Sequence, residues 1–406
     1  MNIAIFTDTY FPQISGVSTS VRLLKEALVR RGHRVYIFTT SDPEAEAETD
    51  IFRLPSMPFI FLPARRVALL YPPKLMLKMR SLAIDVIHTQ TEFPLGIFGA
   101  IAAEFLKVPL VHTYHTMYED YVHYVANGHI FTPKMAQQYS RIFCNRARAV
   151  ITPTDKSRDS LLAYGVERPV RVIPTGLNFA PFARGRFSQA ELDEAKHEVG
   201  LNLTDPVVVS VGRVAKEKGV DVVVREFPKL LAKLPSAKLL FVGDGPMLPE
   251  LKAMAQAEGI VDSVIFAGQR PWDVIGKYYQ LGDVFVNAST SETQGLSYIE
   301  AMAAGVLVCA KADKVIEGIV INGQTGCSFV EDEALADMLY EALTDNAMRE
   351  RVIAAAYENI QPLSCETFAA SAETLYNELL GAYPPPRRRR TRTHQKHVME
   401  FKEGFK

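Results

Sequence analysis

The amino-acid sequence predicts an α/β protein with two domains, each built on a parallel sheet that carries helices on both faces. Along most of the 406 residues, short runs rich in Val and Ile alternate with amphipathic helical segments. Continuous apolar runs of this kind are typical of parallel strands buried on both faces. The alternation occurs in two successive stretches of similar size, which favours two Rossmann-like domains.

The first stretch opens on an apolar strand, and Gly32 ends the helix that follows it. Its expected strands are Asn2–Phe6, Arg34–Thr39, Asp85–His88, Pro109–Thr113, Ala149–Thr152 and Val170–Pro174. Its expected helices are Val17–Arg31, Pro94–Leu106, Pro133–Arg146 and Lys156–Tyr164.

The second stretch repeats this scheme. Its expected strands are Val207–Val211, Lys238–Val242, Ser263–Phe266, Asp283–Asn287 and Val306–Cys309. Its expected helices are Val220–Lys233, Met247–Glu258, Trp272–Leu281 and Leu296–Ala303, followed by a helix-rich segment over 333–359.

We place the first domain at residues 1–185 and the second at 186–362. The segment 178–205 shows no strand pattern, and we assign the linker to it. After a break at Pro362, a last helix is expected within 363–383. Three consecutive prolines then end the folded part, and residues 384–406 are expected to form a disordered basic tail.

Composition narrows the class of protein. With 48% hydrophobic and 22% charged residues, the chain resembles a soluble protein with large cores rather than a collagen, a disordered chain or a small disulfide scaffold. Its four cysteines form no CxxC pair, which favours buried thiols in a reducing compartment. No apolar stretch approaches the ~18 residues of a membrane span. The N-terminus has no basic lead, so no signal peptide is expected.

The charge is distributed unevenly. The net charge is −1 overall, but residues 384–406 carry eight Lys or Arg and two Glu. This basic tail on an acidic body indicates an anionic partner for the tail. A nucleic-acid-binding body would be basic over a whole face, so nucleic acid is not an expected partner.

Loops that follow strands carry the candidate site, because ligands of such sheets bind beyond the carboxyl ends of the strands. Gly16 ends the first loop and precedes a helix, a place suited to phosphate, although a plain turn glycine is an equal alternative. Arg213 and Lys218 follow the strand 207–211 and are suited to a diphosphate. The alternative is a solvated basic loop paired with Glu217.

Two further loops lie in the second domain. Gly243, in the turn 242–247, would let the backbone approach a ligand, unless it serves only a tight turn. In the segment 291–300, Gly295 and Leu296 should begin a helix whose free amides attract an anion. Glu292 before that helix and Glu300 within it are good acceptors for the hydroxyls of a nucleotide-sugar. A helix-start acid and a surface Glu would be the ordinary alternative.

His115 follows the strand 109–113 in a segment with several histidines, 112–124. Their spacing matches no zinc pattern, and the chain has no HExxH motif, so no metal site is expected. We expect His115 to contact a sugar or a leaving group, with a purely structural histidine as the alternative.

Taken together, these segments resemble the retaining family 4 glycosyltransferases over roughly residues 1–381. The pair Glu292 and Glu300 matches the E-x7-E motif of that family, and 212–219 matches its Arg/Lys loop. The segments 87–96, 113–124 and 291–296 are similar to those of bacterial 1,2-diacylglycerol 3-glucosyltransferases. The resemblance implies the GT-B fold, in which two Rossmann-like domains face each other across a cleft.

The resemblance also implies roles for the site residues. Arg213 and Lys218 would hold the diphosphate of UDP-glucose, with Gly16 against it. Glu292 would bind the sugar hydroxyls, Glu300 the ribose, and His115 the sugar near the reacting carbon. The family needs no essential metal, and Mg²⁺ would at most stimulate. Glucose would pass to the 3-hydroxyl of diacylglycerol with retained configuration.

A lipid acceptor implies a peripheral enzyme on the cytoplasmic face of the cell membrane. Leu75, Met79 and Leu82 share one face of a short predicted helix at 72–80, flanked by Lys and Arg, and we expect this face to meet an anionic bilayer. Packing of that face in the core is the alternative. Open alternatives for the activity are transfer to phosphatidylinositol, a glycan or a small metabolite, or a UDP-sugar 2-epimerase reaction.

Overall fold

The structure, a computed structural model, describes residues 1–13, 15–59, 62–69, 73–119, 132–290, 292 and 294–384. The chain divides into two compact units. The first comprises Met1–Gly176 and the C-terminal segment from Cys365, and the second comprises Leu177–Ser364. These boundaries, at 176 and 364, compare with the expected ones at 185 and 362. The expected basic tail lies outside the described residues except for Pro384.

The first unit contains a seven-stranded parallel sheet in the order β3-β2-β1-β6-β7-β8-β9. Its strands are β1 (Asn2–Phe6), β2 (Arg34–Thr40), β3 (Ile51–Leu54), β6 (Val86–Thr89), β7 (Leu110–Thr113), β8 (Ala149–Thr152) and β9 (Val170–Val172). A separate hairpin consists of β4 (Ser56–Phe59) and β5 (Leu62–Ala68). The helices are α1 (Gly16–Arg30), α2 (Pro73–Ser81), α3 (Pro94–Leu106), α4 (Pro133–Cys144), α5 (Asp155–Ala163) and α13 (Cys365–Ala382).

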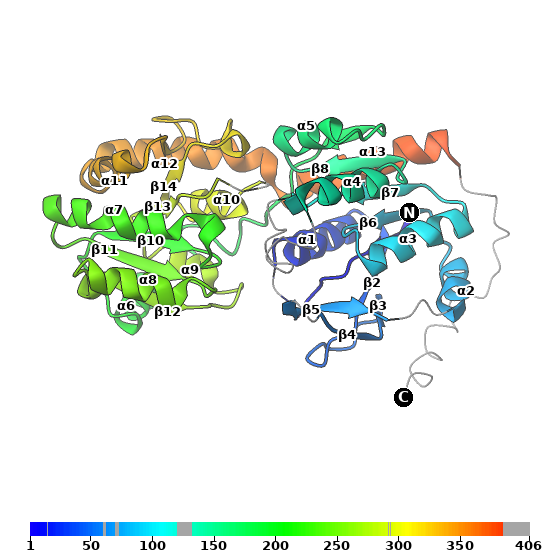
Figure 1. Ribbon diagram of the computed structural model, residues 1–406, viewed down its shortest axis with the longest axis horizontal. Helices are drawn as coiled ribbons and strands as arrows, with labels where there is room; N and C mark the ends of the chain where they lie inside the picture. The colour runs from blue at the N-terminus through cyan, green and yellow to red at the C-terminus, as the bar shows by residue number, and fades with distance from the viewer. Residues whose placement is uncertain are drawn as a thin grey trace. The chain divides into compact units, whose positions relative to one another are not determined.

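Successive residues of a strand point to opposite faces of the sheet, so the side chains of these strands pack into a core on each face. Phe6 of β1 stacks on Phe38 of β2, and it meets Phe98 of α3 on the same face. On the opposite face, the ring of His88 is hydrogen-bonded to Tyr376 of α13, which packs beside α1. The C-terminal helix therefore completes the covering of the first sheet (Figure 1).

The second unit contains a six-stranded parallel sheet in the order β12-β11-β10-β13-β14-β15. Its strands are β10 (Val207–Val211), β11 (Lys238–Val242), β12 (Val264–Gly268), β13 (Val284–Asn287), β14 (Leu307–Lys311) and β15 (Cys327–Phe329). Its helices are α6 (Gln189–Glu198), α7 (Val220–Lys233), α8 (Leu248–Ala257), α9 (Ile275–Tyr279), α10 (Leu296–Ala303), α11 (Leu335–Thr344) and α12 (Asn346–Ile360). The expectation of two Rossmann-like domains with parallel sheets is confirmed.

Both sheets reverse their strand order once, between β1 and β6 in the first unit and between β10 and β13 in the second. At such a switch point the following helices diverge to opposite faces and leave a crevice at the carboxyl ends of the strands. The loops after β10 and β13 contain Arg213, Lys218 and Glu292. Fold topology and sequence motif thus point to the same edge of the second sheet.

One helix was not expected from the sequence, and one sequence-based expectation about a helix is wrong in detail. The segment 178–205 contains a helix, α6, which Ser188 and Glu191 begin with a reciprocal capping box. The expected helix 272–281 is shortened to α9, which begins only at Ile275. In the described part of the chain, no helix combines the length and the apolar character that crossing a bilayer requires. All four cysteines are buried and free, as expected.

The expected lipid-facing side of the helix at 72–80 is also wrong. Met79 of α2 is fully buried, and Leu75 is almost so. Both belong to the core of the first unit, with Leu82 packed against the same cluster. Helical periodicity correctly placed these three residues on one face, but that face is buried in the hydrophobic core of the first unit rather than facing outward. Lys74, one of the basic residues that flank this face, has no described side chain.

Candidate active site

The basic loop after β10 and the acidic loop after β13 meet through an ion pair. Nζ of Lys218 lies 2.6 Å from Oε1 of Glu292. Glu292 is 9% exposed, and the Lys218 side chain is 27% exposed, so the pair is only partly accessible to water. Shielding of this kind strengthens the attraction compared with a surface pair. Two residues predicted from motifs 74 positions apart are therefore in direct contact.

Close backbone packing holds these loops together. A Cβ on Gly219, whose φ is +61°, would lie 2.4 Å from the carbonyl oxygen of Ala288. A Cβ on Gly243, whose φ is +148°, would lie 1.9 Å from the carbonyl oxygen of Gly212. Only glycine tolerates these approaches. Gly243 thus has a structural task, the contact between two loops, in addition to the ligand contact expected from the sequence.

Arg213 lies on the exposed side of the same loop. Its side chain is 44% exposed, and its guanidinium is 3.6 Å from Oε1 of Glu217. The pairing with Glu217, which the sequence analysis gave as the alternative, is therefore present. An exposed pair of this kind is weak, about 0–1 kcal/mol, so an anion that binds Arg213 more strongly would replace it.

The start of α10 supplies backbone donors at the same edge. Gly295 is the N-cap residue, with φ +73°, and Leu296 is the first residue of the helix. Because Gly295 has no side chain to cap the first turn, the backbone N–H groups there are positioned to bind an anion. The helix dipole adds positive potential at this end.

Glu300 occupies the second turn of α10 and is held by a buried tyrosine. The hydroxyl of Tyr279 donates a hydrogen bond of 2.6 Å to Oε2 of Glu300. Burial raises the pKa of Glu300 above its usual value, and the hydrogen bond from Tyr279 partly opposes that rise. Tyr279 is itself fully buried. Burial raises its pKa well above the usual value, and the carboxylates of Glu300 and Glu292 add to that rise.

Tyr279 was not identified from the sequence. It belongs to α9, a helix of five residues between β12 and β13, and its packing partners are Phe182 and Phe285. No motif marks it, since a tyrosine beside another tyrosine in a short helix is ordinary core composition. Its role becomes visible only from the contact with Glu300.

His115 lies in the first unit, in the loop after β7. Its Nε2 is 2.7 Å from Oε1 of Gln90, which follows β6 directly. Burial lowers the pKa of His115 to about 3, and the ring of His112 contributes to the fall. The imidazole is therefore neutral at any physiological pH.

Gly16 is exposed at the first position of α1, and a Cβ on it would meet nothing within 4 Å. The conformation of the loop therefore does not demand glycine at this position. Nearby, Asp8 accepts hydrogen bonds from Thr91 and from the backbone N–H of Leu95 at the start of α3. Burial raises the pKa of Asp8 to about 6.

The predicted residues thus fall into two groups. Arg213, Lys218, Glu292 and Glu300, with the glycines 243 and 295 and with Leu296, belong to the carboxyl edge of the second sheet. His115 and Gly16 belong to the first unit.

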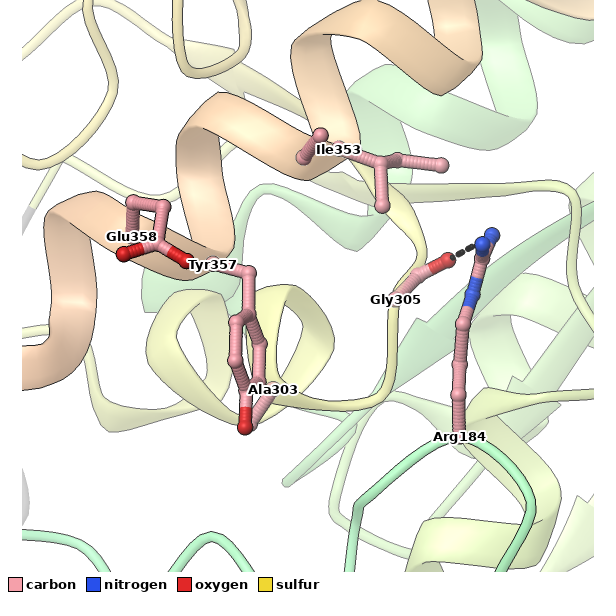
Figure 2. A pocket seen from close by; sticks show the side chains of 7 residues that line it. Arg184, Ala303, Gly305, Ile353, Tyr357 and Glu358 are labelled. Carbon is pink, nitrogen blue, oxygen red and sulfur yellow. Dashed lines mark hydrogen bonds between the residues drawn. The ribbon is translucent and has the colours of Figure 1, made fainter.

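A separate cavity of about 320 Å³ opens at the other end of α10, beside Ala303, Gly305 and Tyr357 of α12. Figure 2 shows Arg184 bonding to the carbonyl oxygen of Gly305 there. Because this cavity lies beyond the last turn of α10, it is distinct from the loops that carry Glu292 and Lys218.

Potential metal ligands do not converge anywhere in the described ranges. There, no group of three or more His, Cys, Asp or Glu side chains is placed to hold a metal ion. His88 and His112 use their ring nitrogens in hydrogen bonds to protein groups.

Comparison with known proteins relates this fold and site to one enzyme family. The family model described as Glycosyltransferase Family 4 matches residues 14–180, and the model described as Glycosyl transferases group 1 matches residues 192–359. Alpha-monoglucosyldiacylglycerol synthase of Streptococcus pneumoniae is 39% identical over 93% of this chain and 85% of its own length. The enzyme of the same name from Acholeplasma laidlawii is 33% identical over 94% of this chain and 98% of its own length.

Solved structures show the same fold. Alr3699/HepE of Anabaena, crystallised with UDP and glucose, superposes with a TM-score of 0.74 at 20% identity. The match covers 93% of this chain and all of that one. The glycosyltransferase WaaG of lipopolysaccharide biosynthesis has a TM-score of 0.69 at 16% identity, covering 92% and 99% of the two chains. These neighbours place the fold in the GT-B class.

Proposed function

The chain belongs to glycosyltransferase family 4, and from this premise we propose that it transfers glucose from UDP-glucose to the 3-hydroxyl of 1,2-diacylglycerol. The product would be alpha-monoglucosyldiacylglycerol, formed with retention at the anomeric carbon. The observation that carries this proposal is the similarity, over nearly the whole chain, to two enzymes named for making this lipid. The UDP and glucose bound by HepE support a nucleotide-sugar donor.

The carboxyl edge of the second sheet would hold the donor. The diphosphate would accept hydrogen bonds from Lys218, Arg213 and the amides at Gly295 and Leu296. Lys218 would then exchange its contact with Glu292 for a phosphate oxygen, which frees the Glu292 carboxylate to accept from sugar hydroxyls. Glu300, oriented by Tyr279, would accept from the ribose.

Positioning and electrostatics would supply most of the rate. No carboxylate is an obvious nucleophile, so we propose departure of UDP followed by attack of the acceptor hydroxyl on the same face of the sugar. The bond from the anomeric carbon to the phosphate oxygen breaks, and the new bond to the lipid oxygen forms. The proton of that hydroxyl passes to the departing phosphate. The charge that develops on UDP would be stabilised by Lys218, Arg213 and the start of α10, with no essential metal.

A lipid acceptor requires attachment to a membrane. Since Leu75 and Met79 are buried and Leu82 packs against the same core, we propose that exposed apolar residues of α2 and α3 make the membrane contact instead. Leu77 of α2 is 63% exposed, and Ile101 and Phe105 of α3 are 44% and 46% exposed. The guanidinium carbon of Arg80 lies 5.7 Å from the ring centre of Phe105. Apolar side chains beside a cation match the boundary between acyl chains and anionic headgroups. We place this face on the inner surface of the cell membrane.

The activity is tested by incubating the protein with diacylglycerol and a panel of UDP- and GDP-sugars, followed by mass spectrometry of the lipids. A hexosyl-diacylglycerol formed from UDP-glucose is expected. A product formed only on phosphatidylinositol, a glycan or a small metabolite would refute the acceptor. Conversion of the donor without any acceptor would indicate an epimerase. NMR of the anomeric proton then decides whether the linkage is alpha.

Membrane attachment is tested by sedimentation with vesicles of neutral or partly anionic lipid. We expect stronger binding to anionic vesicles, lowered by the pair Leu77→Glu and Phe105→Glu. Val261→Glu is the matched control, since Val261 is 52% exposed on the second unit. Equal binding of all three proteins would refute the proposed face.

A further inference from the structure

Three histidines gather around β6 and β7 of the first unit, and two of them are saturated by protein partners. His88 contacts Tyr376 through Nδ1 and Thr113 through Nε2, each at 2.7 Å. His112 contacts Thr89 through Nδ1 at 3.0 Å and Glu92 through Nε2 at 3.1 Å. Both rings are fully buried. These contacts give both rings a structural role.

His115 differs from the other two histidines. Its side chain is partly exposed, and the hydrogen bond between Nε2 and Gln90 is the one that its ring makes to the described part of the chain. Gln90 therefore holds the Nε2 edge of the imidazole, and within the described residues no hydrogen bond to Nδ1 is found.

Gln90 is a rigid support for this ring. Only 1% of the residue is exposed. Its backbone N–H donates to the carbonyl of Phe6 at 2.8 Å, which ties it to the carboxyl end of β1. Its amide oxygen contacts Nε2 of His115, and its amide nitrogen is buried without a hydrogen-bond partner. With the amide oxygen of Gln90 toward the ring, as in the structure, Nε2 of His115 is the donor and carries the proton, since an amide oxygen accepts.

We propose that Gln90 is the positioning residue of His115: its side-chain oxygen fixes the tautomer protonated on Nε2, and this makes Nδ1 an acceptor for a substrate hydroxyl. The identity of that hydroxyl, on the glucose or on the lipid, rests on the proposed function. The assignment excludes a phosphate as the partner of His115, because phosphate oxygens are acceptors and Nδ1 then has no proton to donate.

The surroundings keep the ring in this state. Burial is the main cause that lowers the pKa of His115 to about 3. The ring of His112 faces it and adds to the effect, while the carboxylate of Glu92 is engaged by His112 and by the hydroxyl of Tyr118. His88 is the remaining titratable neighbour, and burial lowers its pKa as well. A carboxylate in place of the Gln90 amide would raise the pKa of His115, because a negative charge favours the imidazolium.

The tautomer is tested directly by two-bond ¹H–¹⁵N NMR of the ¹⁵N-histidine-labelled protein, with His115→Gln to assign the signals. We expect the Nε2-protonated pattern for His115 between pH 5 and 8. Gln90→Met, which keeps the side-chain volume, should give mixed tautomers. An Nδ1-protonated or charged ring at pH 6 in the unaltered protein would overturn the proposal.

Kinetics supply the second test. Gln90→Met should lower kcat about 10- to 100-fold, the scale on which small misplacements act, with little change in the KM for UDP-glucose. Gln90→Glu should restore activity at pH 8 but lose it as the pH falls, because the imidazolium cannot accept a hydrogen bond. A Gln90→Glu profile that parallels that of the unaltered enzyme would refute the role of Gln90.

The two ideas fail separately. The NMR experiment needs no substrate. If His115 shows the expected tautomer but no glycolipid is formed, the proposed function is refuted and the Gln90 assignment stands. If the protein makes the glycolipid normally but His115 shows the opposite tautomer, the Gln90 assignment is refuted and the proposed function stands. Deoxy analogues of UDP-glucose then locate the hydroxyl, since the analogue that lacks it should be insensitive to Gln90→Met.

Discussion

The hydrogen bond between Tyr279 and Glu300 leads to a quantitative prediction about donor binding. Tyr279→Phe removes one hydroxyl while the ring keeps its packing against Phe182 and Phe285. A hydrogen bond to a charged group contributes about 1.5–3 kcal/mol. If Glu300 binds the ribose, that energy sets the upper limit of the lost donor affinity, about 10- to 100-fold, since about 1.4 kcal/mol corresponds to a factor of ten.

The same change has a predictable pH dependence. Burial raises the pKa of Glu300, and the Tyr279 hydroxyl opposes that rise by stabilising the carboxylate. Removing the hydroxyl therefore raises the pKa further, and the variant should protonate Glu300 at a higher pH than the unaltered enzyme does. Donor affinity of the variant should fall earlier as the solution is acidified.

The assay is calorimetric titration with UDP and measurement of the KM for UDP-glucose, each from pH 5.5 to 8. Tyr278→Phe is the matched control, because Tyr278 lies in the same helix but its hydroxyl contacts Glu198 at 3.4 Å. The reasoning would be refuted if Tyr279→Phe bound UDP as tightly as Tyr278→Phe at every pH while the circular dichroism of both stayed unchanged.

Three further predictions concern the same molecule. Lys218→Met and Glu292→Gln should each lower kcat about 10²- to 10³-fold without loss of fold, the scale for removing one electrostatic stabiliser, and near-normal turnover in both would contradict the site. EDTA should leave most of the activity, because cationic side chains and the start of α10 take the place of a metal; complete loss restored by Mg²⁺ would contradict this. Burial raises the pKa of Asp8 from 3.8 to about 6, so the folded protein holds the Asp8 proton more tightly than the unfolded chain does. The free energy of unfolding should therefore fall by about 3 kcal/mol as the pH rises from 3.8 to about 6. Urea unfolding of Asp8→Asn should lack that component of the pH slope, and identical slopes would count against it.

Much of the second unit was predictable because its strands, helices and site residues are marked by short, continuous sequence patterns. Val207–Val211 and Leu296–Ala303 have the bounds expected from their apolar patterns. The strand order then indicates which edge binds a ligand, because the order reverses between β10 and β13. Two edge strands, β3 and β15 (Cys327–Phe329), escaped prediction. Neither contains valine, whereas the equally short strands β8 and β9 contain valine and were expected from the sequence.

The α2 helix shows a second limit of prediction from sequence: an apolar face can be found, but what covers it cannot. The spacing of Leu75, Met79 and Leu82 defines one apolar face, and the structure agrees with that spacing. A bilayer and a protein core both attract such a face by the same burial of apolar surface, so the pattern alone cannot choose between them. What decides is whether the folded protein buries that face, and here the core of the first unit does so. The informative residue is therefore Leu77, which lies off that face and stays 63% exposed although burial would favour it. Apolar side chains that folding leaves outside, rather than the regular stripe, are the ones on which a membrane-binding hypothesis should be built.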